Sequence, residues 1–210
     1  MTNPTQIFVR DFDSSQLPPS SPLSESERNF IETAKVLDVE IGCGVGWHPI
    51  QYATNHPERR LLAIEHTRNK FEKFQRRFEH HELSNLLPIH ANAISWMTSH
   101  LSEQSISRLL ILYPNPNPKD KSKRWFCMPF MHRLLKMLRE DGEIILATNE
   151  KGYRDEALNY ALNFWKLRLE EEKKIEAPQT QYRTHFEKKY IERGETCWNL
   201  IFKKSSMKPC

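Results

Sequence analysis

Short apolar runs of strand type alternate with segments of helical spacing between Val36 and Thr148, and this alternation is the strongest constraint on the fold. Strand–helix alternation specifies a parallel sheet with helices packed against it. The strand-type runs are 36–41, 61–65, 87–90, 106–113 and 143–148. Two later segments, 164–169 and 198–202, are predicted to close the sheet as an antiparallel pair. We therefore expect an α/β domain with a seven-stranded, mostly parallel sheet, helices on both faces and an antiparallel last strand.

Helices are predicted between the strands, and the first of them has a clear start signal. Ser24 and Glu27 make the S-x-x-E pattern of a capping box. The predicted helices are 25–34, 47–55, 67–81, 94–100, 125–138 and 153–163. Residues 1–23 are rich in Ser and Pro, and we expect a flexible tail or an extended arm there. Residues 24–204 are expected to form a single domain, followed by a C-terminal tail at 205–210.

The composition of the chain favours a cytoplasmic protein without a metal site. The chain has 210 residues, enough for one sizeable core, and a mildly basic net charge of +4. Its four cysteines are scattered and form no C-x-x-C pair, which is typical of a protein kept in a reducing compartment. We find neither the apolar core of a secretory signal nor an apolar stretch of membrane-spanning length.

A glycine loop follows the first predicted strand and opens the next helix. Gly42, Gly44 and Gly46 have the spacing G-x-G-x-G, whereas a dinucleotide fingerprint needs G-x-G-x-x-G. Trp47 crowds the helix start where a pyrophosphate would bind, and Glu40 stands just before the glycines. These features favour a ligand with an amine and a sulfonium over NAD or FAD. For the glycines alone, a tight turn without a ligand is the alternative.

Polar residues also end the two neighbouring strands. Glu65 can accept hydrogen bonds from both hydroxyls of a ribose, a role that acidic residues have in nucleotide-binding α/β sheets. Asn92 follows the third strand, and its amide offers both a donor and an acceptor to an adenine edge. Together with Glu40, these residues describe an adenosyl pocket without a phosphate. They predict S-adenosylmethionine as the cofactor.

A rigid loop follows the apolar run that ends at Tyr113. Its sequence, Pro-Asn-Pro-Asn-Pro-Lys, covers residues 114–119. Because proline fixes φ and keeps the preceding residue extended, Asn115 and Asn117 have little backbone freedom. Loops at the carboxyl ends of parallel strands bind ligands in open α/β sheets, so we expect this loop to line a site. For Asn117, ordinary turn formation is the alternative that we favour.

With these motifs the chain resembles the bacterial tRNA (guanine-N7)-methyltransferases, which use S-adenosylmethionine on a Rossmann-like class I methyltransferase fold. The resemblance runs from about Glu40 to Phe202. Its motifs are E-I-G-C-G-V-G at 40–46, Y-P-N-P-N-P-K at 113–119, A-T-N at 147–149, and T-H-F-E at 184–187 followed by E-R-G at 192–194. The family has F-P-D-P-W-P-K for the second motif and A-T-D for the third.

The resemblance implies a role for each matching position. It places Asn115 at the catalytic loop position of the family. The implied cofactor-binding residues are Glu40, Gly42, Gly44, Gly46, Glu65, Asn92 and Asn115. The implied substrate-binding residues are Lys119, Asn149, Thr184 and Glu187.

Asparagine stands at 92, 115 and 149, where the family usually has aspartate. Guanine N7 carries a lone pair and no proton, so its methylation needs alignment rather than a general base. A carboxylate can accept hydrogen bonds from N1–H and the exocyclic amine together, whereas an amide offers one acceptor, and a mismatch costs about 1–3 kcal/mol. Glu187 keeps its charge and is expected to receive the guanine edge. We expect an active enzyme of altered rate or base preference, in which Asn115→Asp and Asn149→Asp raise guanine turnover.

Basic residues gather in two places that could contact RNA. The first group follows the proline loop, where phosphate contacts would position a nucleoside, and consists of Lys119, Lys121, Lys123 and Arg124. The second group lies on the predicted helix 67–81 and consists of Arg68, Lys70, Lys73, Arg76 and Arg77. For the second group a solvated helix face is the favoured alternative.

The expected partner is tRNA, with no membrane and no metal, and the expected assembly is a monomer or a homodimer. Two other functions stay open. One is an RNA-binding relative that binds S-adenosylmethionine and has lost turnover, for which the three asparagines argue. The other is a small-molecule methyltransferase, which the lysine-rich loop and the T-H-F-E motif disfavour.

Overall fold

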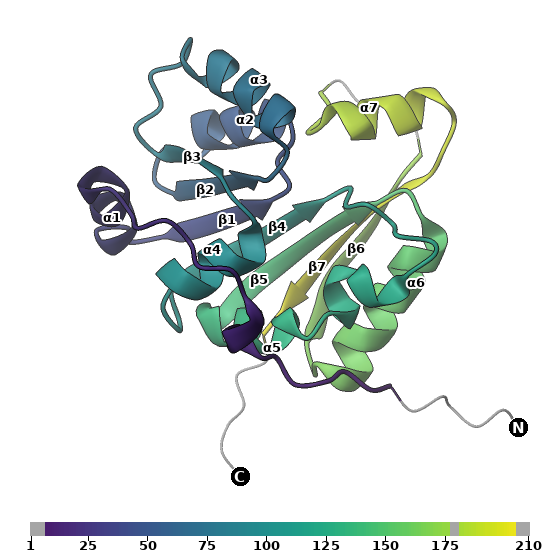
Figure 1. The fold of residues 1–210 in the computed structure, drawn as a ribbon. Coiled ribbons are helices and arrows are strands. Elements are labelled where there is room, and N and C mark those ends of the chain that lie inside the picture. The colour runs from purple at the N-terminus through teal and green to yellow at the C-terminus, as the bar shows by residue number, and fades with distance from the viewer. Residues whose placement is uncertain (1–6, 177–180, 205–210) are drawn as a thin grey trace, which may run out of the picture.

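The computed structural model describes residues 7–176 and 181–204, which form seven strands and seven α-helices around one sheet (Figure 1). The strands are β1 (Leu37–Ile41), β2 (Arg60–Glu65), β3 (Leu86–His90), β4 (Ile106–Leu112), β5 (Leu138–Thr148), β6 (Arg168–Ile175) and β7 (Cys197–Lys203). The helices are α1 (Glu25–Glu32), α2 (Trp47–Asn55), α3 (Arg68–Phe78), α4 (Ala93–His100), α5 (Phe130–Met137), α6 (Lys151–Asn159) and α7 (His185–Glu192).

The strand order is β3-β2-β1-β4-β5-β7-β6. Neighbours from β3 to β5 pair in parallel, whereas β7 pairs antiparallel with both β5 and β6. The predicted α/β class, the seven strands and the antiparallel last strand are therefore confirmed. The chain order turns back between β1 and β4, which is where open α/β sheets bind ligands.

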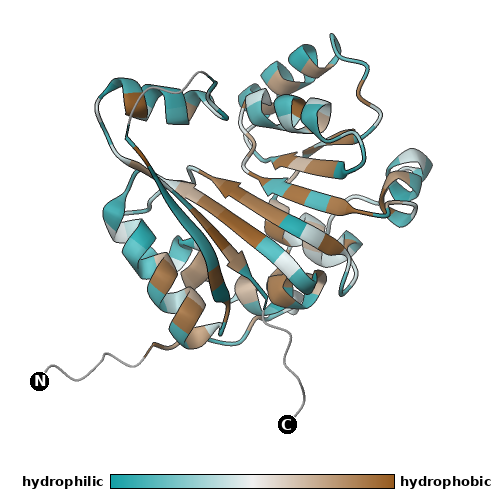
Figure 2. Cartoon of the chain, turned by 180° about the vertical axis from the view of Figure 1, so that it is seen from behind, coloured by the Kyte–Doolittle hydropathy of each residue, from teal (hydrophilic) through white to brown (hydrophobic). Residues whose placement is uncertain are grey.

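Apolar side chains cover both faces of the sheet because neighbouring residues of a strand point to opposite sides. Leu109 and Ile111 of β4 belong to the core that packs against α4, α5 and α6. Leu110 and Leu112 belong to the core on the side of α2, α3 and α7. Figure 2 shows the inner strands mainly in the hydrophobic colour and β6 largely in the hydrophilic one.

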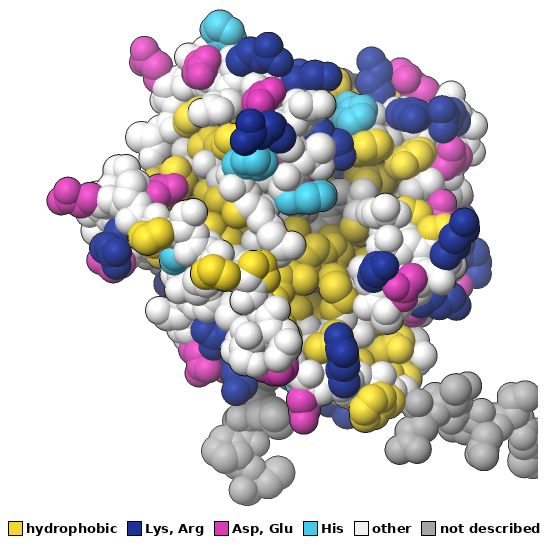
Figure 3. Space-filling model, viewed as in Figure 1, with side chains coloured by type: hydrophobic (Ala, Val, Ile, Leu, Met, Phe, Trp, Pro, Cys, Tyr) yellow, Lys and Arg dark blue, Asp and Glu magenta, His cyan; other side chains and the backbone are white. Residues whose placement is uncertain are grey.

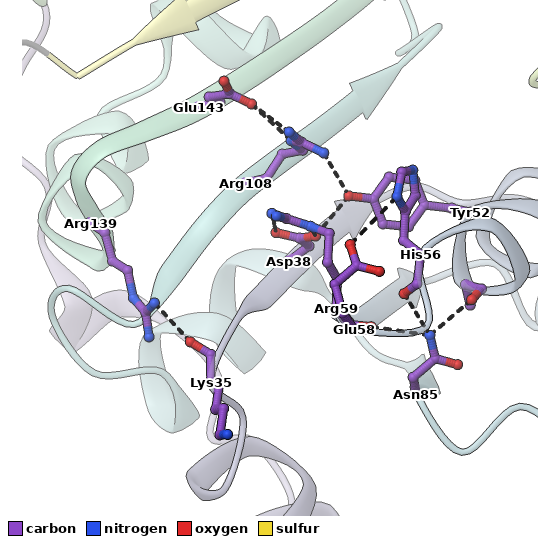
Figure 4. A network of polar contacts seen from close by, with 11 residues as sticks. Lys35, Asp38, Tyr52, His56, Glu58, Arg59, Asn85, Arg108, Arg139 and Glu143 are labelled. Carbon is purple, nitrogen blue, oxygen red and sulfur yellow. Dashed lines mark hydrogen bonds and ion pairs between the residues drawn. The ribbon is translucent and has the colours of Figure 1, made fainter.

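A buried polar network fixes the amino-terminal half of the inner strands on the α2 side (Figure 4). Asp38 of β1 is fully buried and accepts two hydrogen bonds from Arg59, at 2.5 and 2.6 Å, and one from the Tyr52 hydroxyl at 2.8 Å. Arg108 of β4 donates to the same hydroxyl at 2.9 Å and to Glu143 of β5 at 2.9 Å. Burial and the Asp38 charge raise the pKa of Tyr52 to about 12. The network therefore ties β1, β4, β5 and α2 together away from the strand ends where a ligand would bind.

Several element boundaries differ from the sequence prediction. The strand predicted at 164–169 is β6 at 168–175, and the prediction was wrong because this edge strand is mostly charged and exposed. The helix predicted at 125–138 is split into a 3₁₀ turn at Trp125–Cys127 and α5, because Pro129 holds Met128 in an extended conformation. The strand predicted at 143–148 is longer in the structure, because β5 begins at Leu138.

The amino-terminal segment lies along the domain over the residues that the structure describes, 7–23. Val9 is buried, and the Phe12 ring meets the Phe130 ring edge-on with centroids 5.5 Å apart. His100 of α4 makes hydrogen bonds with Ser20 Oγ and the Ser21 carbonyl at 3.2 and 3.0 Å. The predicted capping box of α1 is present. The rest of the predicted tail, 1–6, and the C-terminal tail, 205–210, lie outside the described residues.

Candidate active site

A cavity of about 480 Å³ lies at the carboxyl ends of β1, β2 and β4, where five of the predicted cofactor-binding residues come together. Those five are Gly42, Gly44, Glu65, Asn92 and Asn115. Its other wall is apolar and aromatic, and Figure 3 shows a hollow lined by hydrophobic side chains with Lys and Arg around it. The main apolar contributors are Tyr113, Trp125, Met128, Phe186 and Tyr190. Such a mixture of a few polar groups with apolar walls is typical of a small-molecule site.

Glu65 anchors the glycine loop on one side of the cavity. Its buried carboxylate accepts the Gly44 N–H at 2.9 Å through Oε2 and the Thr67 N–H at 2.8 Å through Oε1. Each oxygen keeps a second acceptor position for a ligand hydroxyl. Burial, together with the charges of Glu40 and Glu65, raises the pKa of Cys43 in this loop. The Cys43 thiol is therefore protonated and is not a nucleophile.

The three positions of the glycine loop require glycine for different structural reasons. All three adopt positive φ angles, 72° at Gly42, 63° at Gly44 and 78° at Gly46, which favour glycine. A Cβ at Gly46 would lie 1.9 Å from the Phe74 ring of α3, so this glycine allows α3 to pack close to the loop. Gly42 and Gly44 line the cavity, whereas Gly46 does not.

Glu40, the acidic residue before the glycines, lies beside the main cavity rather than in it. Its buried carboxylate is 2.6 Å from Nδ1 of His48 on α2. With Gly42 and Gly44 it lines a narrow recess of about 20 Å³ that Thr184 and Phe186 of the α7 segment close from the other side. A ligand group reaching Glu40 would therefore enter between the glycine loop and α7.

Asn92 acts as the N-cap of α4 in addition to lining the cavity. Its Oδ1 accepts hydrogen bonds from the N–H groups of Ile94 and Ser95 at 3.0 and 3.3 Å. Aspartate would cap the helix in the same way, so the amide preserves the local structure. What the amide adds is an NH₂ donor at the cavity wall.

The proline loop is held by its own asparagines. The Asn117 N–H donates to Asn115 Oδ1 at 3.0 Å, and Asn117 Nδ2 donates to the Asn115 carbonyl at 3.1 Å. Asn117 has a positive φ of 42°, which asparagine tolerates well. Turn formation, the favoured interpretation of Asn117, is therefore confirmed. Asn115 lines the cavity, and the exposed Lys119 lies outside it.

Glu187, predicted to receive a guanine edge, is buried and fully engaged with its own chain. Its Oε2 accepts the Tyr113 hydroxyl at 2.7 Å and the Arg183 guanidinium at 2.6 and 3.0 Å, while Oε1 accepts the Arg183 N–H at 3.1 Å. Burial raises the pKa of Glu187, but the bonds from Arg183 and Tyr113 outweigh it and leave the pKa lowered. Thr184 caps α7 by accepting the Glu187 N–H at 3.0 Å. In this structure the T-H-F-E motif fastens α7 to the proline loop.

The sequence does not predict that Arg183 and the Tyr113 hydroxyl bind the Glu187 carboxylate. Arg183 lies just before α7, and its spacing of four residues from Glu187 was the only signal for this ion pair. Arg183 also donates to Asn199 Oδ1 of β7 at 2.6 Å. Burial and the nearby Glu187 charge raise the pKa of Tyr113, so its hydroxyl stays a proton donor.

Asn149, the third asparagine, follows β5 at the same edge of the sheet. Its Nδ2 donates to Glu195 Oε2 at 2.7 Å, in the loop between α7 and β7. Asn149 and Glu195 do not line the main cavity, but the Glu195 N–H donates to the carbonyl of Tyr190, which does. The sequence does not predict Glu195, because its place depends on how α7 returns to the sheet.

Most residues of the two basic groups are exposed, and a few of them have contacts that the sequence does not predict. Arg124, assigned to the RNA-contacting group, is buried, pairs with Glu156 and donates to the Pro116 carbonyl at 2.6 Å, so it supports the proline loop. On α3, Lys70 lines the cavity and Arg77 donates to the Val45 carbonyl of the glycine loop at 2.7 Å. All five basic residues of α3 are exposed, as expected for a solvated face, and two of them also contact the site.

No helix in residues 7–176 and 181–204 has the length and apolar character needed to span a bilayer. Within the same residues, no three His, Cys, Asp or Glu side chains are grouped so that they could share a metal ion.

Comparison with known proteins identifies the family of the chain. The family model "Putative methyltransferase" (Methyltransf_4) matches residues 34–200. The tRNA (guanine-N(7)-)-methyltransferase of Buchnera aphidicola subsp. Schizaphis graminum is 30% identical over 178 residues, covering 83% of this chain and 74% of the relative. The protein of that name from Nitrosomonas eutropha is 30% identical over 80% of this chain and 76% of its own. For the one from Thermotoga maritima, 32% identical, the match covers 67% of this chain and 45% of the relative.

Solved structures confirm the fold. A variant of the 16S rRNA (adenine(1408)-N(1))-methyltransferase of Catenulisporales acidiphilia with cosubstrate SAM superposes with a TM-score of 0.66 at 12% identity, over 90% of this chain and 95% of that one. The 16S rRNA methyltransferase KamB gives a TM-score of 0.65 at 17% identity, over 88% and 95%. At these identities the likeness establishes the class I methyltransferase fold alone. Because the family model covers most of the chain and relatives at 30% identity align over three-quarters of their length, the chain belongs to the family of tRNA (guanine-N7)-methyltransferases.

Proposed function

We propose that this protein transfers a methyl group from S-adenosylmethionine to N7 of a guanosine in tRNA. The observation that carries the proposal is the cavity in which the glycine loop, Glu65 and Asn92 face the proline loop and the aromatic wall of α7. The names of the relatives agree with it. The substrate implies a cytoplasmic location, and a monomer or a homodimer remains the expected assembly.

The residues present fit the cofactor. Glu65 has acceptor positions left for ribose hydroxyls, and Asn92 presents an amide to the adenine side. Gly42 and Gly44 let the backbone approach the ligand closely, since nothing lies within 4 Å of the place where a Cβ would stand. The cavity, about 480 Å³, is within the usual range for small-molecule sites.

The chemistry asks the protein to align two reactants and to exclude water. Bound S-adenosylmethionine supplies an electrophilic methyl group on sulfur. The lone pair of guanine N7 would take this methyl group as the carbon–sulfur bond breaks and S-adenosylhomocysteine leaves, so no side chain has to remove a proton. The proline loop, fixed by Asn115 and Asn117, and the rings of Trp125 and Tyr190 can hold a base in line with the cofactor. Losing carboxylates at 92, 115 and 149 is compatible with this chemistry.

RNA binding would rest on cations around the cavity mouth. Lys119, Lys121 and Lys123 are exposed beside the proline loop, and Lys70 lines the opposite side. Phosphate contacts from such residues orient a substrate without reading its sequence. They also predict binding that weakens steeply with salt.

Incubation with methyl-labelled S-adenosylmethionine and unmodified tRNA tests the function. We expect label in the RNA and 7-methylguanosine after digestion to nucleosides. Tight cofactor binding without transfer would instead identify a relative that binds RNA and has lost turnover. Label in small molecules but not in RNA would identify a small-molecule methyltransferase.

A further inference from the structure

The pair Asn149–Glu195 does not line the cavity, but its two segments are hydrogen-bonded to residues of the cavity wall. The Tyr113 N–H donates to the Ala147 carbonyl at 2.8 Å, which places the end of β5 next to the start of the proline loop. From the other direction, the Glu195 N–H donates at 3.0 Å to the carbonyl of Tyr190, a residue of the cavity wall. Asn149 Nδ2 joins the two segments through its 2.7 Å bond to Glu195 Oε2.

A base bound as guanine needs an acceptor for its N1–H and exocyclic amine. Glu187 cannot serve in this arrangement, because Tyr113 and Arg183 already occupy its buried carboxylate. Glu195 is different, since its side chain is 37% exposed and its Oε1 is 4.0 Å from the Arg193 guanidinium, beyond hydrogen-bonding distance. The Glu195 carboxylate therefore keeps acceptor capacity while Asn149 holds it in place.

We propose that Glu195 is the specificity-determining residue that accepts the N1–H and amine hydrogens of the target guanine, with Asn149 positioning it. This inference rests on the proposed function. Adenine has an unprotonated N1, which is an acceptor and would face the acceptor oxygens of the same carboxylate. Asn149 and Glu195 together therefore select against adenine.

The same geometry explains the amide at 149. An aspartate there would bring its carboxylate next to that of Glu195, at a contact now only 2.7 Å long, and like charges that close repel strongly. The increase in turnover expected for Asn149→Asp from the sequence is therefore reversed, and we now expect this change to lower turnover of guanine.

Inosine, which lacks the exocyclic amine, provides the test. The methylated position of a tRNA transcript is first mapped with the wild-type protein, and the same RNA is then made with inosine at that position. We expect the wild-type protein to prefer guanosine by at least about tenfold in kcat/KM, the effect of one lost hydrogen bond to a charged group. Glu195→Gln should lower kcat/KM for guanosine about tenfold or more and bring the guanosine-to-inosine ratio to within about threefold.

Glu150→Gln is the matched control, because Glu150 is an exposed acid next to Asn149 whose side chain does not cap α6. This variant should keep the wild-type ratio, and Glu195→Gln should keep the wild-type affinity for S-adenosylmethionine. If Glu195→Gln is unstable, Asn149→Ala, which frees Glu195, should reduce the same ratio. A wild-type ratio preserved in both folded variants refutes the proposal. Absence of 7-methylguanosine with the wild-type protein refutes the proposed function instead.

Discussion

The hydroxyl of Tyr113 is a single polar group that joins the proline loop to α7, and Tyr113→Phe removes it without changing the ring. The hydroxyl donates to Glu187 Oε2 at 2.7 Å, in a position where both residues are buried. A hydrogen bond to a charged group is worth about 1.5–3 kcal/mol. Arg183 still donates to the same carboxylate after the change, so Glu187 is not left unpaired. We therefore expect the lower end, a loss of about 1.5 kcal/mol in the free energy of unfolding.

Urea titration at pH 7 measures this loss, and a thermal scan should show a fall in Tm of about 3–6 °C for a chain of this size. Glu187→Gln is the matched comparison. It removes the charge opposite Arg183, whose side chain is still 32% exposed, so we expect a loss of about 2–3 kcal/mol rather than the 3–5 of a fully buried pair. Catalytic efficiency should fall in Tyr113→Phe through kcat, because the loop loses its tether to α7 while the cofactor contacts stay. A Tyr113→Phe variant whose unfolding free energy lies within about 0.5 kcal/mol of wild type would refute this reasoning.

Three further outcomes follow from the same structure. Gly46→Ala should lower the unfolding free energy by about 2 kcal/mol or more, measured by urea titration, because the new Cβ would lie 1.9 Å from the Phe74 ring and φ is 78°. Because the pKa of Glu187 is lowered, its stabilising effect is complete above the ordinary glutamate value of 4.5 and is lost as the pH falls through the lowered value. Below pH 4.5 the wild-type protein should therefore lose more stability than Glu187→Gln, as measured by parallel denaturation curves. Lys119→Ala should weaken tRNA binding and reduce the slope of log K against log salt by about 1 in filter-binding assays, with unchanged affinity for S-adenosylmethionine.

Local sequence signals were sufficient for most of the sheet. The inner strands are buried on both faces, so their sequences are nearly continuous apolar runs. Their limits in the structure lie within a residue or two of the predicted ones. The edge strand β6 was misplaced because its exposed residues follow no apolar pattern. The split before α5 depends on one proline within an otherwise helical pattern.

Part of the cavity lining could also be predicted from sequence position. Residues at the carboxyl ends of parallel strands meet at one edge of the sheet, so Gly42, Glu65, Asn92 and Asn115 could be brought together from their positions in the sequence alone. Tyr113 as a partner of Glu187 and Glu195 as the partner of Asn149 could not, because they lie 74 and 46 positions away in the sequence and depend on how α7 packs. Motif similarity identified Glu187 as an important residue, but it did not identify the residues that Glu187 contacts.

Both edges of the sheet discourage further strand pairing. On one side, β6 exposes a run of charged side chains that includes Glu171 and Lys173. On the other, the short strand β3 contains Pro88, which has no N–H to offer to a neighbour. A second copy of the chain therefore cannot extend this sheet easily. A homodimer would have to be built from helices and loops, and fibrous association through β-strands is disfavoured even at high concentration.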